Sequence, residues 1–353
     1  MNSYNPTILS TFTANPKYTK STSEILRDME IHLADHDERF RRKVLRIFEY
    51  AQVDRRYSIM PAEDVLAPLS FEQKNNRYME QVKMLGEEVL TGALERANLT
   101  PHDIDFIITV SCTGFMIPSL DAYLINQLNM RQDVVRLPVT EMGCAAGVSA
   151  MIYAEQFLRA NPQKRAAIVS VESPMSTFQH GDFSMANMVS AALFGDGAAC
   201  AILGPSDQPG PQVLGSEMFH FFDEIDMMGF HLSDSGFRMV LSPDVPEKIE
   251  SHFGEILHPF LERFGLTIAD IQHLIFHPGG KKIIQLAEQL FAEFEKDLTD
   301  TRAVLRDFGN MSSATVLFVL DRLMSRAVPT GDYGLMLSFG PGFSAQRVLL
   351  KWQ

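Results

Sequence analysis

The segment LERANLTPHDIDFII at 94–108 recurs as LERFGLTIADIQHLI at 261–275, with eight of fifteen positions identical at an offset of 167 residues. Each copy reads as the end of a helix, a short turn and an Asp-Ile pair that leads into an apolar run. Such a run is typical of a buried strand in an α/β sheet. Because a repeat decides architecture before local propensities do, the sequence predicts a duplicated α/β fold.

Two shorter landmarks recur in the same order. Within EMGCAAGVSAMIYAEQFL at 141–158 and RDFGNMSSATVLFVLDRL at 306–323, Gly143 is aligned with Gly309 and Cys144 with Asn310, and each segment reads as a glycine-containing turn that opens a helix. LFGDGAACAIL at 193–203 aligns with SFGPGFSAQRVLL at 338–350, and each reads as a glycine-rich turn that enters a strand. The same supersecondary units are therefore expected in both copies.

The segment PSDQPGP at 205–211 is rich in Pro and Gly and lies between the copies. We therefore predict an N-terminal half at 1–206 and a C-terminal half at 213–353. The length of 353 residues is ample for two such units.

Composition excludes several classes of protein. With 46% hydrophobic and 21% charged residues, the chain is expected to fold as a globular protein. Its net charge of −13 argues against a duplex nucleic acid partner, so any phosphate site must be local. No signal peptide and no apolar stretch of about 18 residues is seen, so neither export nor a membrane span is expected.

Three cysteines, Cys112, Cys144 and Cys200, form neither a disulfide framework nor a zinc motif. Their use fits a reducing cytoplasm.

The two copies differ where chemistry is expected. At the aligned turn that opens a helix, one half carries Cys144 and the other Asn310, and the repeated strand ends in FHPGG at 276–280 in the second half only. A duplicated fold places equivalent loops face to face at strand ends, so Cys144, His277 and Asn310 are expected to converge.

These residue types suit covalent acyl transfer. A cysteine at a helix N-terminus beside an imidazolium is expected to have a lowered pKa, which favours a nucleophilic thiolate. Histidine and asparagine can donate hydrogen bonds to an oxygen that gains negative charge.

Simpler roles stay open. Cys144 could be a buried core residue, and Asn310 could serve only a turn or a helix cap. His180, His231 and His273 could equally be solvated or structurally bonded. His277 is better placed, because Pro278, Gly279 and Gly280 leave its strand end open to a ligand.

Five motifs and the N-terminal ILSTFTANP together resemble the type III polyketide synthases, the chalcone synthase-like condensing enzymes, over nearly the whole chain. The motifs are MGCAAG around Cys144, LFGDGAA at 193–199, HPGG at 277–280, GNMSSATVLFVLD at 309–321 and FGPG at 339–342. The resemblance implies a thiolase-like αβαβα fold that acts as a homodimer, with Cys144, His277 and Asn310 as the catalytic triad.

The same resemblance implies the reaction. Cys144 takes an acyl group from a coenzyme A thioester, and His277 and Asn310 stabilise the enolate formed when malonyl-CoA loses carbon dioxide. The enolate then attacks the Cys144 thioester, and repeated cycles extend the chain before it is cyclised. Neither a metal nor a resident cofactor is expected.

Cavity residues follow from the motif positions. Phe194 matches the first of two gating phenylalanines of plant members, whereas Met239 stands at the second. A flexible thioether accommodates aliphatic shapes better than a fixed ring, so a fatty acyl starter is favoured, although ordinary packing is an equal explanation. The resemblance places the other residues of the cavity and interface at Thr177, Phe230, Ser312, Cys112 and, across the dimer interface, Ile117.

Cys112 stands where plant enzymes usually carry threonine and several bacterial relatives carry cysteine, which suggests a bacterial type of enzyme. It could influence cyclisation or be a small apolar wall residue.

The coenzyme A site is expected at basic residues of FRRKVLRIFEYAQVDRRY at 40–57. Lys43 and Arg46 match two basic positions of the family, and Tyr50 stands at the third. Gly279 and Gly280 are expected beside them. A solvated basic helix face is the alternative.

Two rival functions are weighed against this one. A ketoacyl-ACP synthase III shares the triad, but its histidine is typically followed by Gln-Ala-Asn and its asparagine loop reads Gly-Asn-Thr. A catalytically silent scaffold is the other rival. Within the favoured family, the expected products are alkylpyrones or alkylresorcinols, with a tetrahydroxynaphthalene-type phenolic as the alternative.

Overall fold

The computed structural model of the protein describes residues 4–353. Its strands are β1 (Thr7–Ala14), β2 (Tyr18–Ser21), β3 (Arg55–Ser58), β4 (Phe106–Val110), β5 (Val135–Val139), β6 (Ala166–Glu172), β7 (Gly197–Gly204), β8 (Pro211–His220), β9 (Met228–Ser233), β10 (Gly236–Leu241), β11 (His273–Phe276), β12 (Tyr333–Gly340) and β13 (Ser344–Trp352).

Its helices are α1 (Thr22–His32), α2 (Glu38–Tyr50), α3 (Ala62–Val65), α4 (Phe71–Arg96), α5 (Leu120–Gln127), α6 (Ala146–Ala160), α7 (Met185–Leu193), α8 (Val245–Glu262), α9 (Lys281–Leu290), α10 (Thr299–Phe308) and α11 (Thr315–Met324).

Nine strands form one large mixed sheet in the order β11-β12-β13-β8-β1-β7-β6-β4-β5. The two halves of the chain meet between β1 and β8, where Thr7 pairs with Gln212. On each side of this seam two antiparallel pairings lead outward to a parallel pair, β6 with β4 and β12 with β11. The sheet is thus a duplicated unit, as the repeat predicts.

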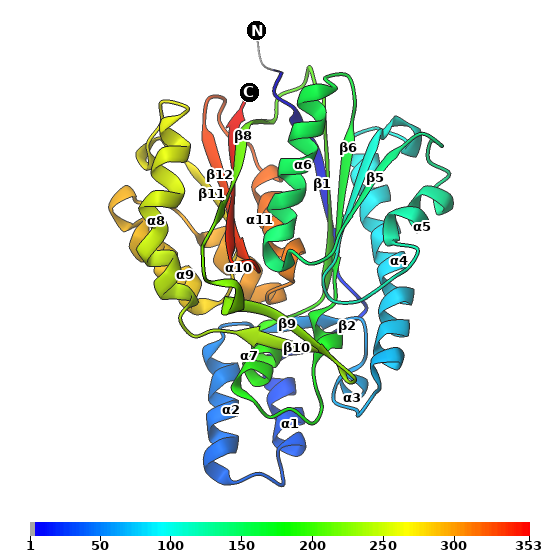
Figure 1. Ribbon diagram of the computed structural model, residues 1–353, viewed down its shortest axis with the longest axis vertical. Coiled ribbons are helices and arrows are strands. Elements are labelled where there is room, and N and C mark those ends of the chain that lie inside the picture. The colour runs from blue at the N-terminus through cyan, green and yellow to red at the C-terminus, as the bar shows by residue number, and fades with distance from the viewer. Residues whose placement is uncertain (1–3) are drawn as a thin grey trace.

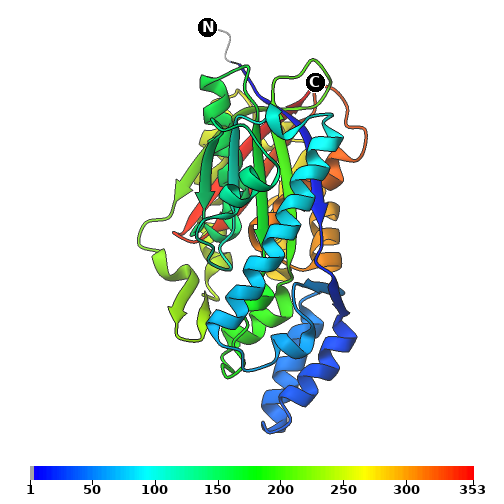
Figure 2. The same ribbon diagram turned by 90° about the vertical axis from the view of Figure 1, so that its right-hand side faces the viewer.

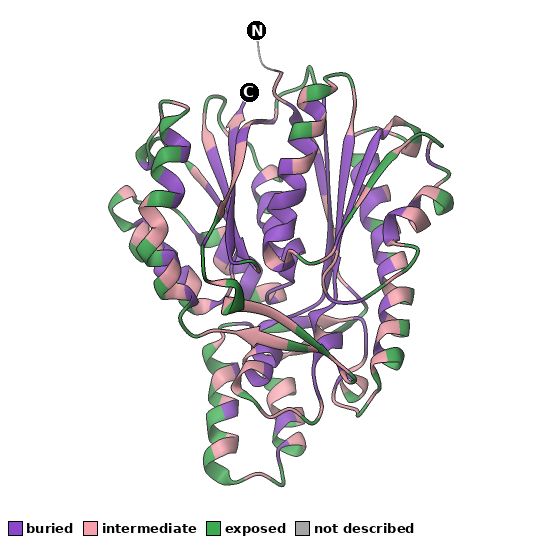
Figure 3. Ribbon diagram, in the orientation of Figure 1, coloured by how far each residue is buried: buried purple, intermediate pink, exposed green. Residues whose placement is uncertain are grey.

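Helices fill three layers around these sheet halves (Figure 1). α6 and α11 lie between them, and their residues form the central core with the inward faces of the strands. α4 and α5 cover the outer face of the N-terminal strands, and α8 and α9 cover that of the C-terminal strands. Figure 3 shows that most residues of the two central helices are buried. The predicted layered αβαβα fold is confirmed.

The long repeat has the same local structure in both halves. Thr100 and Thr267 each open a 3-10 turn, and each backbone N–H donates to the aspartate three residues later, Asp103 at 2.7 Å and Asp270 at 2.8 Å. This capping box stabilises the start of the turn, after which the chain enters β4 or β11. The boundary between the halves, near 206 and 213, stays a prediction, with β7 ending at Gly204 and β8 beginning at Pro211.

The expected pairing of Cys144 with Asn310 is wrong by three residues. Gly143 and Ser312 both have left-handed φ values, 51° and 49°, and each begins the 3-10 turn that precedes a central helix. Cys144 therefore corresponds to Ser313. The sequence alignment was anchored on glycines, whereas the second half uses a serine in the conformation that glycine favours.

A smaller layer caps one end of the sheet. α1, α2, α3 and α7 lie there with the short strands β2, β3, β9 and β10, and α1 and α2 project furthest in Figure 2. Within residues 4–353, no helix is both long and apolar enough to cross a membrane.

Candidate active site

A cavity of about 690 Å³ lies between the large sheet and this cap. Cys144, His277 and Asn310 all line it, together with apolar residues of α7, β9 and β10. The three residues that the sequence predicts to converge do therefore share one cavity.

Cys144 is held at the start of the central helix α6. Its loop turns sharply because Gly143 adopts a φ of 51°, and a Cβ at Gly143 would lie 2.6 Å from Cδ of Pro341. The FGPG turn of the C-terminal half thus packs directly on the loop that carries Cys144 in the other half. The helix N-terminus adds a positive dipole at this cysteine.

Asn310 is fixed by both its backbone and its side chain. Its N–H donates to Leu193 O at 2.9 Å, and its carbonyl accepts from Gly195 N at 3.1 Å. Its Oδ1 accepts from Ser312 N at 2.8 Å and lies 4.0 Å from Cys144 Sγ. The amide oxygen is thereby occupied, which orients the NH2 group as a donor.

His277 follows β11 and is almost fully buried. Its backbone N–H donates to Leu337 O at 2.9 Å, whereas neither ring nitrogen has a partner among the described residues. Burial lowers the pKa of His277 to about 3. The imidazole is therefore neutral, with both nitrogens free to meet a substrate.

The expected low pKa of the nucleophile is not found. Burial raises the pKa of the Cys144 thiol to about 12, and the Ser312 hydroxyl and the Asn310 side chain oppose this rise only in part. Desolvation outweighs the helix dipole because the sulfur sits at the bottom of an apolar cavity.

Most of the expected wall residues line the same cavity. They are Phe194, Met239, Phe230, Cys112 and Ser312. Cys112 Sγ lies 3.5 Å from the Ser312 hydroxyl, which joins the two halves at the cavity floor.

Two residues of that set lie elsewhere. Thr177 is buried in a 3-10 turn, where its hydroxyl donates to Pro174 O at 2.7 Å. Ile117 is 93% exposed and does not contribute to the cavity of its own chain.

Some of the residues expected to bind coenzyme A line the cavity, and one does not. Arg46, Gly279 and Gly280 line the cavity, and Lys43 is exposed on α2 outside the lining. Tyr50 lines the cavity as well.

Sequence reasoning did not single out Glu172, a fully buried acid at the end of β6. Its carboxylate accepts from Cys112 N at 3.0 Å and from the hydroxyls of Thr113, at 2.8 Å, and Ser313. Burial raises the pKa of Glu172. The signal that could have found it is a lone carboxylate at the end of the apolar run AAIVSVE.

The three competing histidines have other surroundings. His273 Nε2 lies 2.8 Å from Asp332, His180 Nδ1 lies 2.5 Å from Leu66 O, and His231 is exposed on β9. None of them lines the cavity.

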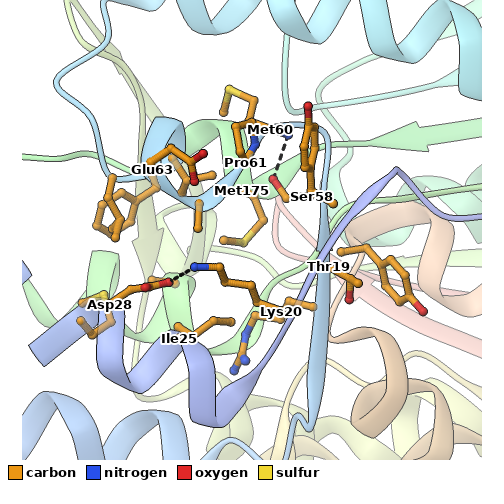
Figure 4. Close-up of a pocket in the computed structure, with 18 of the residues that line it drawn as sticks. Thr19, Lys20, Ile25, Asp28, Ser58, Met60, Pro61, Glu63 and Met175 are labelled. Carbon is orange, nitrogen blue, oxygen red and sulfur yellow. Dashed lines mark hydrogen bonds and ion pairs between the residues drawn. The ribbon is translucent and has the colours of Figure 1, made fainter.

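A second cavity of about 300 Å³ lies between α1, β3 and α3 (Figure 4). Lys20 and Asp28 form an ion pair of 2.5 Å in it, and Met60 and Met175 contribute apolar wall. No cysteine or histidine lines it, so the three residues that are expected to be catalytic line the larger cavity alone.

Comparison with protein families decides the assignment. The model "FAE1/Type III polyketide synthase-like protein" matches residues 11–211, and "Chalcone and stilbene synthases, C-terminal domain" matches residues 217–352. The chain belongs to the type III polyketide synthases. It is thus an acyltransferase that condenses coenzyme A thioesters and needs no resident cofactor, as the motifs predict.

The chain is also similar in sequence to individual enzymes of this family. The chain is 36% identical to 1,3,6,8-tetrahydroxynaphthalene synthase of Streptomyces peucetius subsp. caesius, over 87% of this chain and 83% of the relative. It is 29% identical to phloroglucinol synthase of Pseudomonas fluorescens over 96% of both chains.

Solved structures agree with these relatives. The crystal structure of 1,3,6,8-tetrahydroxynaphthalene synthase from Streptomyces coelicolor has a TM-score of 0.92 and 32% identity, covering 98% of this chain and 99% of that one. This type III polyketide synthase therefore shares its fold with a bacterial enzyme of the family.

Proposed function

We propose that this enzyme condenses malonyl-CoA repeatedly onto an aliphatic acyl-CoA starter and then cyclises the product to an alkylpyrone or alkylresorcinol. The supporting observation is a single cavity of about 690 Å³ in which Cys144, His277 and Asn310 stand against walls that include Met239, Met228 and Leu241. Flexible apolar side chains suit an aliphatic tail.

Loading couples proton transfer to the attack on the thioester. Cys144 and His277 are both neutral in the cavity, so the thiol proton passes to the imidazole only as the sulfur forms its bond to the thioester carbonyl. The bond from that carbonyl to the coenzyme A sulfur breaks, and the departing sulfur takes the proton back from His277.

Extension then needs no base, and it consumes one proton when the Cys144 thiolate is protonated again. Malonyl-CoA loses carbon dioxide, the electron pair of the broken C–C bond forms an enolate, and hydrogen bonds from His277 and the Asn310 NH2 group stabilise its oxygen. The enolate carbon attacks the Cys144 thioester, and the thiolate leaves. The lengthened chain returns as a coenzyme A ester for the next cycle.

The test is incubation with malonyl-CoA and acyl-CoA starters of increasing length, with products identified by mass spectrometry. Cys144→Ala should abolish acyl loading, and Asn310→Ala should lower carbon dioxide release by a factor of about 10²–10³. Normal turnover in either variant would refute the assigned roles.

A second candidate is a tetrahydroxynaphthalene-type synthase, favoured by the 36% identity to such an enzyme. Malonyl-CoA alone would then suffice as starter and extender, and longer acyl-CoA starters would not raise turnover. We further propose that the enzyme is a homodimer with Ile117 at its interface. We also propose that it acts in the cytoplasm.

A further inference from the structure

The second cavity of the protein has the size and lining of a ligand site, although the reaction described above does not use it. Its volume of about 300 Å³ lies at the lower end of the range of about 300–1,000 Å³ that small-molecule sites occupy. It lies in the cap, and within residues 4–353 no residue lines both this cavity and the reaction cavity. The cap therefore offers room for a ligand that is separate from the substrates at Cys144.

The walls of the second cavity favour an aromatic ring with a short alkyl group. Met29, Met60 and Met175 line it together with the rings of Phe48 and Phe178. Aromatic pairs prefer edge-to-face packing, and thioether sulfurs make favourable contacts with ring edges. Because methionine side chains are also flexible, they accommodate an alkyl substituent beside the ring. The lining thus fits a small, flat and mainly apolar molecule.

An ion pair supplies the polar end of this cavity. Lys20 and Asp28 form it at 2.5 Å on the α1 side, and Met175 lies across from them in Figure 4. The two side chains are 34% and 28% exposed, so neither is closed off from a ligand. Lysine has three donors and a carboxylate about four acceptor sites, of which the pair uses one each. A ligand hydroxyl can therefore accept from Lys20 and donate to Asp28 at the same time.

Arg56 adds a positive charge to the wall of the cavity. It is 2% exposed, and no carboxylate of the described residues forms an ion pair with it. Its Nη1 donates to Thr22 Oγ1 at 2.8 Å, whereas its buried Nε has no partner. Burial lowers the pKa of Arg56 to about 9, because desolvation disfavours a cation without a counter-charge.

This charge selects the kind of hydroxyl. An oxygen that carries partial negative charge in the cavity would compensate Arg56, and a buried cation gains most from such a partner. A phenolic hydroxyl, with a pKa of about 10, polarises far more readily than an aliphatic one. A full carboxylate fits less well, since it cannot donate to Asp28.

We propose that this cavity binds a small phenol, with a hydroxyl at the Lys20–Asp28 pair and an alkyl group among the methionines. Resting on the proposed function, the inference makes the ligand a resorcinol, so that the enzyme holds its own class of product at a second site. α7 is a wall of both cavities, since Ala191 lines the second and Ala192 the first. A phenol bound in the cap thus contacts the helix that also shapes the reaction cavity.

Calorimetry on the full-length protein tests the ligand chemistry, with 5-pentylresorcinol as the probe. Its dimethyl ether keeps the shape but has no O–H donor, and hexanoate has a charge but no ring. We expect the dissociation constant of the ether to be about tenfold higher or more, because its oxygens cannot donate to Asp28. Hexanoate should show no measurable binding.

Variants test the position of the site. Lys20→Met/Asp28→Leu removes the pair without leaving a single charge, and we expect binding about tenfold weaker or more. Ala62→Phe fills the cavity from its wall and should abolish binding even if the double variant fails to fold. Lys248→Met/Glu224→Leu is the matched control, because this pair has a lysine that is 33% exposed and lines neither cavity. It should bind the probe like the wild type.

Three results would overturn the proposal: no binding to the wild type, equal binding of the ether, or wild-type affinity in Ala62→Phe. Loss of binding in Met239→Trp, which fills the reaction cavity, together with normal binding in Ala62→Phe would place the phenol at the wrong site. If no acyl-CoA starter yields a resorcinol, the proposed product fails. The probe still tests the cavity then, and the variant effects support or refute it as before.

Discussion

Burial sets the protonation state of His277, and this has a measurable effect on stability. Its pKa is about 3 in the folded protein and about 6.5 in an unfolded chain, so between these values only the unfolded state binds the proton. Stability therefore falls as pH falls from 6.5 towards 3, by up to about 1.4 kcal/mol per pH unit. We expect His277→Gln to lose less free energy of unfolding than the wild type between pH 7.5 and pH 4.5.

Urea unfolding at both pH values measures the difference. Burial raises the pKa of Asp196 to about 7, which has the opposite sign and stabilises the fold as pH falls. Because Asp196 is present in both proteins, its effect cancels in the comparison. Equal pH dependence of the two proteins would show that His277 is not held neutral.

Met239 provides a second test at the scale of one residue. Met239→Phe replaces a flexible wall residue of the cavity with a rigid ring. We expect turnover with long acyl-CoA starters to fall by about tenfold or more relative to acetyl-CoA, as measured by mass spectrometry of the products. Met84→Phe, on an exposed methionine, is the control. If Met239→Phe has the same preference among acyl-CoA starters as the wild type, Met239 does not determine which starter is used.

The repeat and the family resemblance together singled out Cys144, His277 and Asn310, and the structure places all three in one cavity, although Cys144 and Asn310 are not equivalent positions of the two halves. Thr177 and Lys43 could not be placed in the same way, since a turn and a helix face decide whether each side chain reaches the cavity, and neither is visible in the residue type.

At the scale of the element, the turn before α6 depends on its glycine. Gly143→Ala would place a Cβ at a φ of 51° and 2.6 Å from Pro341 Cδ. We expect a loss of about 1–2 kcal/mol in the free energy of unfolding from the backbone alone, and slower acyl loading because the loop must move.

Thermal denaturation and acyl-CoA loading check this expectation. Gly181→Ala is the control, because nothing lies within 4 Å of a Cβ there, and its effect should stay within about 0.5 kcal/mol. Loading at the wild-type rate in Gly143→Ala would mean that the turn does not position Cys144.

The same turn shows the limit of aligning the repeat by sequence. Glycine is the usual residue at a left-handed φ, yet Ser312 adopts it in the second half. Its carbonyl accepts from Thr315 Oγ1 at 2.9 Å, and its N–H donates to Asn310 Oδ1 at 2.8 Å. Side-chain hydrogen bonds thus offset the backbone strain at Ser312. The presence of a serine does not by itself indicate a left-handed φ.

At the scale of the whole molecule, the repeat predicted the duplication of an α/β unit, and the family resemblance predicted the layered αβαβα arrangement. The cap of α1, α2, β9 and β10 was not, since these segments have no counterpart in the duplicated pattern.

Association of two chains is the remaining prediction at this scale. Ile117 is 93% exposed, and the family resemblance places it at the interface between two chains. We expect Ile117→Asp to shift the protein from dimer to monomer in sedimentation velocity, whereas Ile31→Asp, on the exposed face of α1, should not. A wild-type monomer would contradict this.

The serine that occupies the place of a second thiol limits how many substrates one polypeptide can carry. Ser313 corresponds to Cys144, but its hydroxyl lies 2.8 Å from that of Ser170 and donates to buried Glu172. The Ser313 side chain therefore serves in hydrogen bonds within the protein. Of the two equivalent positions, only the one occupied by Cys144 can carry an acyl group. Labelled acyl groups should accordingly saturate at one equivalent per chain, so that a dimer would build two independent products side by side.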